Sequence, residues 1–150
     1  MTVHLVKLCV GIDSIAELVR YREEMAAKRR GKKPLEDSHW TRSFPRRADE
    51  VLDGGSLYWV IRGQLCVRHR ILRLDEVEDE AGKPYCAIVY DPTVIVTEMH
   101  PRRAFQGWRY LEAEDAPADR PDQRAALAHA LAEEELPAEL RQELRGLGLL

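Results

Sequence analysis

The alternation of apolar and polar positions predicts a chain with strands through its middle and helices toward both ends. Residues 3–10, VHLVKLCV, are apolar and rich in β-branched side chains, which is typical of a buried strand. In residues 14–30 the apolar side chains recur at helical spacing, and Ser14 and Glu17 fit a capping box at the start of a helix. Gly31 is placed to end that helix in a left-handed turn.

The middle of the chain has the pattern of a β meander. Residues 56–74 predict two strands joined at Gly63–Gln64. Residues 85–98 predict two more, interrupted at Asp91–Pro92. The acidic segment 76–83 between these pairs is expected to be an exposed hairpin connection.

Weaker helical patterns flank the meander. Pro45 suits the first position of a short helix whose apolar face is Ala48, Val51 and Leu52, and the DGG sequence at 53–55 breaks the chain after it. After Tyr110 a segment rich in Pro, Ala and acids leads into two stretches with helical spacing, residues 123–136 and 137–150.

These elements together predict an α+β fold. Residues 3–10 and 56–110 would form a small, curved, mostly antiparallel sheet or a β-barrel, flanked by helices and followed by a C-terminal helical appendage. The division that we expect is an α+β domain over residues 1–112, with a linker and packed helices over residues 113–150.

Composition narrows the class of protein. The 150 residues fit one domain, and 45% hydrophobic with 33% charged content is ordinary for a soluble protein. No apolar run approaches the roughly 20 residues that cross a bilayer, and the first residues lack a secretory signal pattern, so we expect cytoplasmic residence. The three cysteines and five histidines show no metal-ligand spacing, so we expect reduced, buried cysteines, no metal and no cofactor.

Two segments concentrate arginine and aromatic side chains. Residues 38–47, SHWTRSFPRR, and residues 100–110, HPRRAFQGWRY, each contain three arginines and no acid. They also hold both phenylalanines and two of the three tryptophans of the chain. Both segments are expected in loops that flank the same sheet, which would allow them to be neighbours in space.

This pairing of residue types points to nucleotides. Arginine presents a planar fork of donors that matches phosphate oxygens, and an aromatic face stacks on a base. The predicted nucleic-acid-binding residues are Trp40, Arg42, Arg46, Arg47, Arg102, Arg103, Trp108 and Arg109. The alternative is structural, in which the aromatic rings fill the core and the arginines pair with the acidic C-terminal helices.

Two further functions stay open. His39 and His100, each beside arginines, could act as acid and base in a hydrolase that cleaves a phosphodiester or modifies a base. The chain has no nucleophile elbow, Gly-rich phosphate loop or paired-carboxylate motif to support that chemistry. A protein-interaction module working through the acidic C-terminal helices, with or without homo-oligomers, is the other alternative.

The sequence also carries resemblances to known families. VHLVKLCVG, GGSLYWVIRG and PRRAFQGWRYL resemble an uncharacterised, domain-of-unknown-function family of alphaproteobacterial genomes, over nearly the whole chain. More distantly, the order of elements around PRRADEVLDGGSLYWVI looks like the PUA-like barrels, including the ASCH and EVE groups. That resemblance implies a domain that binds RNA or modified nucleobases, and some ASCH members act as hydrolases or nucleases. A lysine matching the ASCH hydrolase pattern is not identified.

Overall fold

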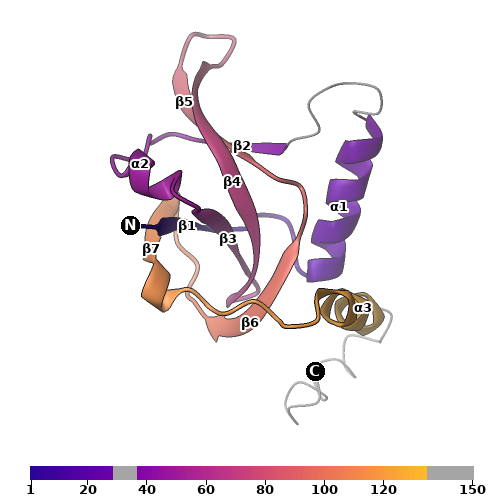
Figure 1. The fold of residues 1–150 in the computed structure, drawn as a ribbon. Coiled ribbons are helices and arrows are strands. Elements are labelled where there is room, and N and C mark those ends of the chain that lie inside the picture. The colour runs from indigo at the N-terminus through magenta and orange to yellow at the C-terminus, as the bar shows by residue number, and fades with distance from the viewer. Residues whose placement is uncertain (29–36, 135–150) are drawn as a thin grey trace.

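The computed structural model describes residues 1–28 and 37–134, which form one sheet covered by helices (Figure 1). The described elements, in chain order, are β1 (Val3–Leu8), α1 (Ile15–Lys28), β2 (Asp37–Thr41), α2 (Ala48–Val51), β3 (Ser56–Ile61), β4 (Gln64–Glu78), β5 (Pro84–Tyr90), β6 (Ile95–Pro101), β7 (Trp108–Glu112), the 3-10 turn η1 (Ala113–Asp115) and α3 (Gln123–Glu134). The predicted α+β class is therefore confirmed.

The sheet is mostly antiparallel and open. Its strand order is β2-β5-β4-β3-β1-β7, with β6 also paired to β4, and the β1–β3 pair is parallel. The first half of β4 pairs with β3 and β6, and its second half pairs with β5, with register shifts between Leu65 and Val67 and between Ile71 and Arg73. Such irregularities bend a strand. Within the described residues no ladder joins β2 to β7, so the sheet alternative is confirmed and the closed barrel is not formed.

Each face of the sheet has its own apolar core. On one face α1 contributes Ile15 and Leu18 to a cluster that includes Leu57, Trp59 and Ile88. We call this the helix-side face, and α3 extends it through Ala126, Leu127 and Ala130. Figure 1 shows α1 and α3 together on this side of the sheet. On the opposite face a smaller cluster comprises Val6, Tyr58, Val60, Leu65 and Leu111.

The start of α1 follows the predicted cap. The backbone N–H of Glu17 donates to Ser14 Oγ over 3.1 Å, and the carboxylate of Glu17 accepts from the backbone N–H of Asp13 over 3.1 Å. The first bond satisfies a donor that the first turn of a helix leaves without a partner, and the second fastens the residue before the cap. The predicted helix end at Gly31 lies outside the described residues.

The segment that follows η1 is fastened to β6 by backbone hydrogen bonds. Glu98 donates to the carbonyl of Ala118 over 2.8 Å, and Arg120 donates to the carbonyl of Val96 over 2.9 Å. α3 then begins at Gln123, as its spacing predicts. The second predicted C-terminal helix, over 137–150, lies outside the described residues.

Gly55 allows the end of α2 to lie close to β1. A Cβ at this position would stand 2.2 Å from the carbonyl oxygen of Val51 and 2.5 Å from that of Val3. Because both neighbours are backbone atoms, neither can turn away from an added side chain. A glycine here therefore brings the end of α2 against β1.

Three local predictions need correction. Residues 37–41 form a strand, although 38–47 was predicted as a loop, because the edge strand β2 gains its hydrogen bonds from β5, far along the chain. β4 continues to Glu78, so the connection predicted over 76–83 is a shorter turn in which Asp79 accepts from the backbone of Ala81 and Lys83. The short helix begins at Ala48, and Pro45 is buried in the turn before it.

No helix in the described ranges is long and apolar enough to cross a membrane.

Candidate functional site

The two ends of the open sheet are held together by the loop that follows β2. The indole N–H of Trp108 on β7 donates to the carbonyl of Ser43 over 3.0 Å. The backbone N–H of Arg47 donates to the hydroxyl of Tyr110 over 3.1 Å, and its guanidinium pairs with Glu112 over 2.6 Å. Side-chain contacts therefore bridge the gap that no strand ladder closes.

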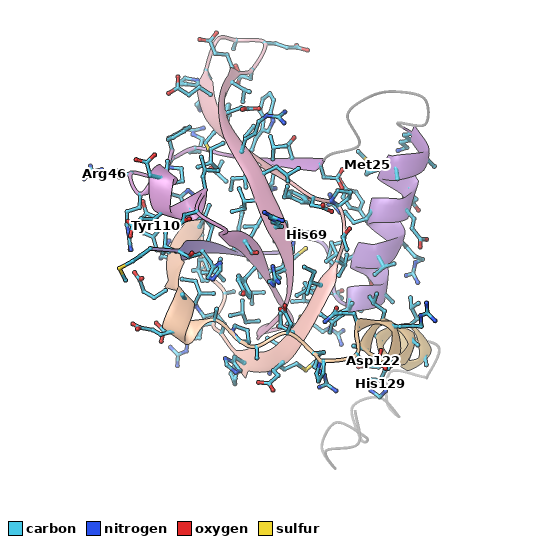
Figure 2. All side chains as sticks on the ribbon, in the orientation of Figure 1. Met25, Arg46, His69, Tyr110, Asp122 and His129 are labelled. Carbon is cyan, nitrogen blue, oxygen red and sulfur yellow. The ribbon has the colours of Figure 1, made fainter. Side chains whose placement is uncertain are left out.

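A cavity of about 740 Å³ opens at this junction between β2, its following loop and β7, and we call it the seam pocket. Its lining includes four cations and five aromatic residues, and no acidic residue. The cations are Lys7, Arg42, Arg46 and Arg109; the aromatic residues are Trp40, Phe44, Tyr85, Trp108 and Tyr110; Thr41, Ser43, Gln106 and Gly107 complete the lining. Figure 2 shows Arg46 at the outer edge of the molecule beside α2, with Tyr110 next to it.

The aromatic side chains of the pocket differ in accessibility. Trp40 is 45% exposed and Phe44 is 42% exposed, so both offer ring surface to a ligand. The Trp40 ring lies 5.7 Å from that of Tyr85 at an interplanar angle of 37°. Trp108 is half-buried and meets Tyr110 edge to face at 4.8 Å. Trp108 thus forms a fixed wall, while Trp40 and Phe44 are free to stack.

The four cations of the pocket are not neutralised by carboxylates. Among the described residues, no ion pair involves Lys7, Arg42, Arg46 or Arg109. Arg42 lies over the Tyr85 ring at 5.6 Å, and Arg109 donates to backbone carbonyls of Gln106 and Trp108. Uncompensated cations around a concave surface create a positive potential that attracts anions.

The structure brings together five of the eight residues predicted to bind nucleic acid. Trp40, Arg42 and Arg46 come from the first basic segment, and Trp108 and Arg109 come from the second. The expected neighbourhood of the two segments is therefore observed, although Trp40 and Trp108 lie on strands and not in the predicted loops.

The other three predicted arginines lie outside the pocket lining. Arg47 forms ion pairs with Glu50 and Glu112, and these carboxylates raise its pKa, so it holds α2 against β7. The guanidinium of Arg102 lies 5.3 Å from the Phe105 ring, which packs on the smaller core. Arg103 is exposed. The alternative in which the arginines pair with acidic side chains therefore holds for Arg47. Its partners lie on α2 and β7, however, and not on the acidic C-terminal helices.

Sequence reasoning missed Lys7 and Tyr85. Lys7 is a half-buried cation on β1, two positions after Leu5, which faces the helix-side core. Since alternate residues of a strand share a face, a lysine at an inward position was a signal that the sequence contained. Tyr85 is contributed by β5, and only the strand pairing places it beside Trp40.

The two candidate catalytic histidines are not brought together. His39 lies on the helix-side face, with its ring 5.5 Å from that of Trp59. Burial, with the charges of Lys7 and Arg22, lowers its pKa to about 4. His100 is exposed on β6, opposite Leu65 of the smaller core, so it lies on the other face of the sheet.

The remaining chemically reactive groups lie in the interior. All three cysteines are buried and free, and burial raises the pKa of the Cys9, Cys66 and Cys86 thiols to about 11, 12 and 11, so they resist ionisation near neutral pH. In the part of the chain that the structure describes, no group of three or more His, Cys, Asp or Glu side chains is arranged to hold a metal ion.

Arg22 links α1 to the first residue of β2. Its guanidinium pairs with Asp37 over 2.9 Å and also donates to the Tyr90 hydroxyl. Asp37 is 2% exposed. This buried pair anchors the strand from which the pocket residues Trp40 and Thr41 project.

Neither the curated proteins nor the solved structures contain a match to this chain. A family model described as "Protein of unknown function (DUF1489)" matches residues 5–150. Because that match spans nearly the whole sequence, including every residue of the seam pocket, the chain belongs to the DUF1489 family.

Proposed function

We propose that this protein is a cytoplasmic module that binds nucleic acid or a nucleotide in the seam pocket, with single-stranded RNA as the favoured ligand. The observation that carries the proposal is the pocket lining, in which four cations and five aromatic rings converge without one acidic side chain. Phosphates would contact the cations, and bases would stack on the exposed rings.

The geometry favours a single strand over a duplex. A concave pocket of about 740 Å³ accepts one or two bases that are turned out of a stack, whereas a duplex presents its bases edge-on and already stacked. Trp40 and Phe44, both more than two-fifths exposed, supply the ring faces that unstacked bases need. The element order of the sequence resembles that of PUA-like domains, which bind RNA or modified nucleobases; this relationship stays a prediction and would imply the same ligand class.

The alternatives have less support. A hydrolase that uses His39 and His100 together would need the two rings at one site, and they lie on opposite faces of the sheet. The interaction module through the acidic C-terminal helices, and any homo-oligomer, stay predictions. In α3 the apolar side chains of Ala126, Leu127 and Ala130 pack on the core of this chain.

Fluorescence anisotropy of a labelled single-stranded oligoribonucleotide tests the proposal. Wild-type protein should bind it with an affinity that falls as salt rises from about 50 to 200 mM, because phosphate contacts release counterions. Trp40→Ala should weaken binding by about 1–3 kcal/mol, the usual contribution of one stacked base. The same oligonucleotide hybridised to its complement should bind more weakly.

Leu72→Ala provides a matched control. Leu72 is 44% exposed, close to the 45% of Trp40, and it lies on β4 outside the pocket lining. Its removal should leave the affinity unchanged. The proposal is wrong if wild-type protein does not bind at low salt, or if Trp40→Ala and Leu72→Ala bind as the wild type does.

A further inference from the structure

Two hydrogen-bonding ring nitrogens lie buried on the helix-side face of the sheet. They are Nε1 of Trp59 on β3 and Nε2 of His39 on β2, and neither has a hydrogen-bond partner among the described residues. Trp59 is only 3% exposed, and its ring meets that of His39 edge to face at 5.5 Å. Burying a polar group without a partner is unfavourable, so native proteins rarely keep one that has no role.

Neither of the two rings lines the seam pocket, and the strand register links Trp59 to it through Lys7. Lys7 lines the pocket and is the cross-strand partner of both Trp59 and Trp108. Since partners in adjacent strands project from the same face, Lys7 stands between the pocket wall Trp108 and the buried Trp59.

The second connection runs along β2. Thr41 lines the pocket and projects from the same face of the strand as His39, two residues earlier. The charge of Lys7 contributes to the lowered pKa of His39, which agrees with their proximity. Lys7 and Thr41 therefore connect the lining of the pocket to the rings of Trp59 and His39.

The two nitrogens have definite hydrogen-bonding capacities. The indole N–H of Trp59 is a donor only, and a neutral imidazole either donates or accepts at Nε2 according to its tautomer. The edges of all four nucleobases carry acceptors beside donors, and their arrangement differs from base to base. Phosphate oxygens are acceptors only, and in the proposed function the exposed arginines donate to them.

We propose that the seam pocket recognises the identity of one nucleobase, whose polar edge passes Lys7 and Thr41 to form hydrogen bonds with Trp59 Nε1 and His39 Nε2. This inference rests on the proposed function and adds base specificity to it. The sugar-phosphate stays at the rim with Arg42, Arg46 and Arg109. A single-stranded RNA and a free nucleotide both present a base edge next to a phosphate, so either could be the ligand.

The test compares ligands that have the same phosphates and different bases. Labelled pentamers of adenylate, cytidylate, guanylate and uridylate, and an abasic pentamer, are bound to wild type and to Trp59→Phe, which keeps a ring and removes the N–H donor. Wild type should bind one of the four base pentamers about tenfold more tightly than the other three. Trp59→Phe should remove most of that preference, because one hydrogen bond contributes about this much to affinity. Affinity for the abasic pentamer should not change.

Tyr58→Phe is the matched control, because it also removes one polar group from a buried ring, on the opposite face of the sheet and outside the pocket lining. It should keep the preference among bases. An unchanged preference in Trp59→Phe, or a wild type that binds all four bases alike, overturns the base-recognition inference and leaves the proposed binding function intact. Failure of every pentamer to bind removes both.

A second measurement does not depend on a substitution at Trp59. The chain has three tryptophans, so its spectrum of ¹⁵N-labelled indole groups should contain three N–H resonances, which Trp40→Phe and Trp108→Phe assign. Titration with the preferred pentamer should move the Trp59 resonance downfield as its N–H finds an acceptor, and an immobile resonance contradicts the inference.

Competition by the matching nucleoside monophosphate at similar concentration identifies a free nucleotide as the ligand, and competition only by the pentamer identifies RNA.

Discussion

Two regions of this molecule combine arginine with aromatic rings and use them in opposite ways. Where α1 meets β2, the guanidinium of Arg22 lies 4.3 Å from the Tyr21 ring and 5.3 Å from the Tyr90 ring. In the seam pocket, that of Arg42 lies 5.6 Å from the Tyr85 ring. Arg22 also has Asp37 at 2.9 Å, whereas no ion pair involves Arg42 in the described residues. The carboxylate therefore distinguishes an arginine that stabilises the fold from one available to a ligand.

The largest effect is expected from breaking the buried pair at the α1–β2 junction. Asp37→Ala would leave the guanidinium of Arg22 buried without its partner, which typically costs about 3–5 kcal/mol of unfolding free energy. Urea denaturation measures the loss. Asp53→Ala is the control, because the Asp53 side chain is 65% exposed and pairs with the N-terminal amine. Equal stability of the two variants would contradict the distinction between the regions.

The second expected effect is a loss of stability in acid, caused by buried histidines near Arg22. Burial, with the charge of Arg22, lowers the pKa of His69 to about 4, and this residue is fully buried on β4 (Figure 2). In the unfolded chain a histidine gains a proton near pH 6.5, whereas the folded one stays neutral until about pH 4. Its contribution to stability is therefore complete above pH 6.5 and is lost as pH falls toward 4, by up to about 3 kcal/mol.

Urea denaturation at pH 7 and pH 4.5 measures this dependence. His69→Leu removes the titrating group, so its stability should fall less between the two pH values than that of the wild type. His39→Phe should act in the same direction, since burial also lowers the pKa of His39 to about 4. Parallel losses in wild type and both variants would show that other groups cause the acid sensitivity.

The smallest expected effect comes from Arg46 and Arg47, two adjacent arginines of which only Arg47 pairs with carboxylates in the described residues. Arg46→Ala should reduce the slope of log affinity against log salt by about 0.7 for single-stranded RNA, and should leave the melting temperature unchanged, because no ion pair involves Arg46 in the described residues. Arg47→Ala should lower the melting temperature and keep the slope, because its guanidinium joins Glu50 to Glu112. Identical behaviour of the two variants would contradict their assignment to different roles.

Many of the fold's elements could be predicted from local patterns. The cap at Ser14, the turn at Gly63 and the break at Asp91–Pro92 appear where the sequence places them, because each depends on residues within a few positions. β2 could not be predicted, since DSHWT has little apolar signal and its ladder with β5 joins residues about fifty positions apart. Likewise, the register shifts of β4 arise from how three strands share its length.

The candidate site shows the same division. The sequence by itself determined that basic and aromatic side chains gather in two segments, since residue type and spacing are local properties. Only the tertiary structure decided that Trp40 and Arg109 share a pocket, that Lys7 joins them and that Arg47 does not. The reason is physical: strand alternation and the distance to the nearest carboxylate depend on which distant strands become neighbours, and no short stretch of sequence contains that information.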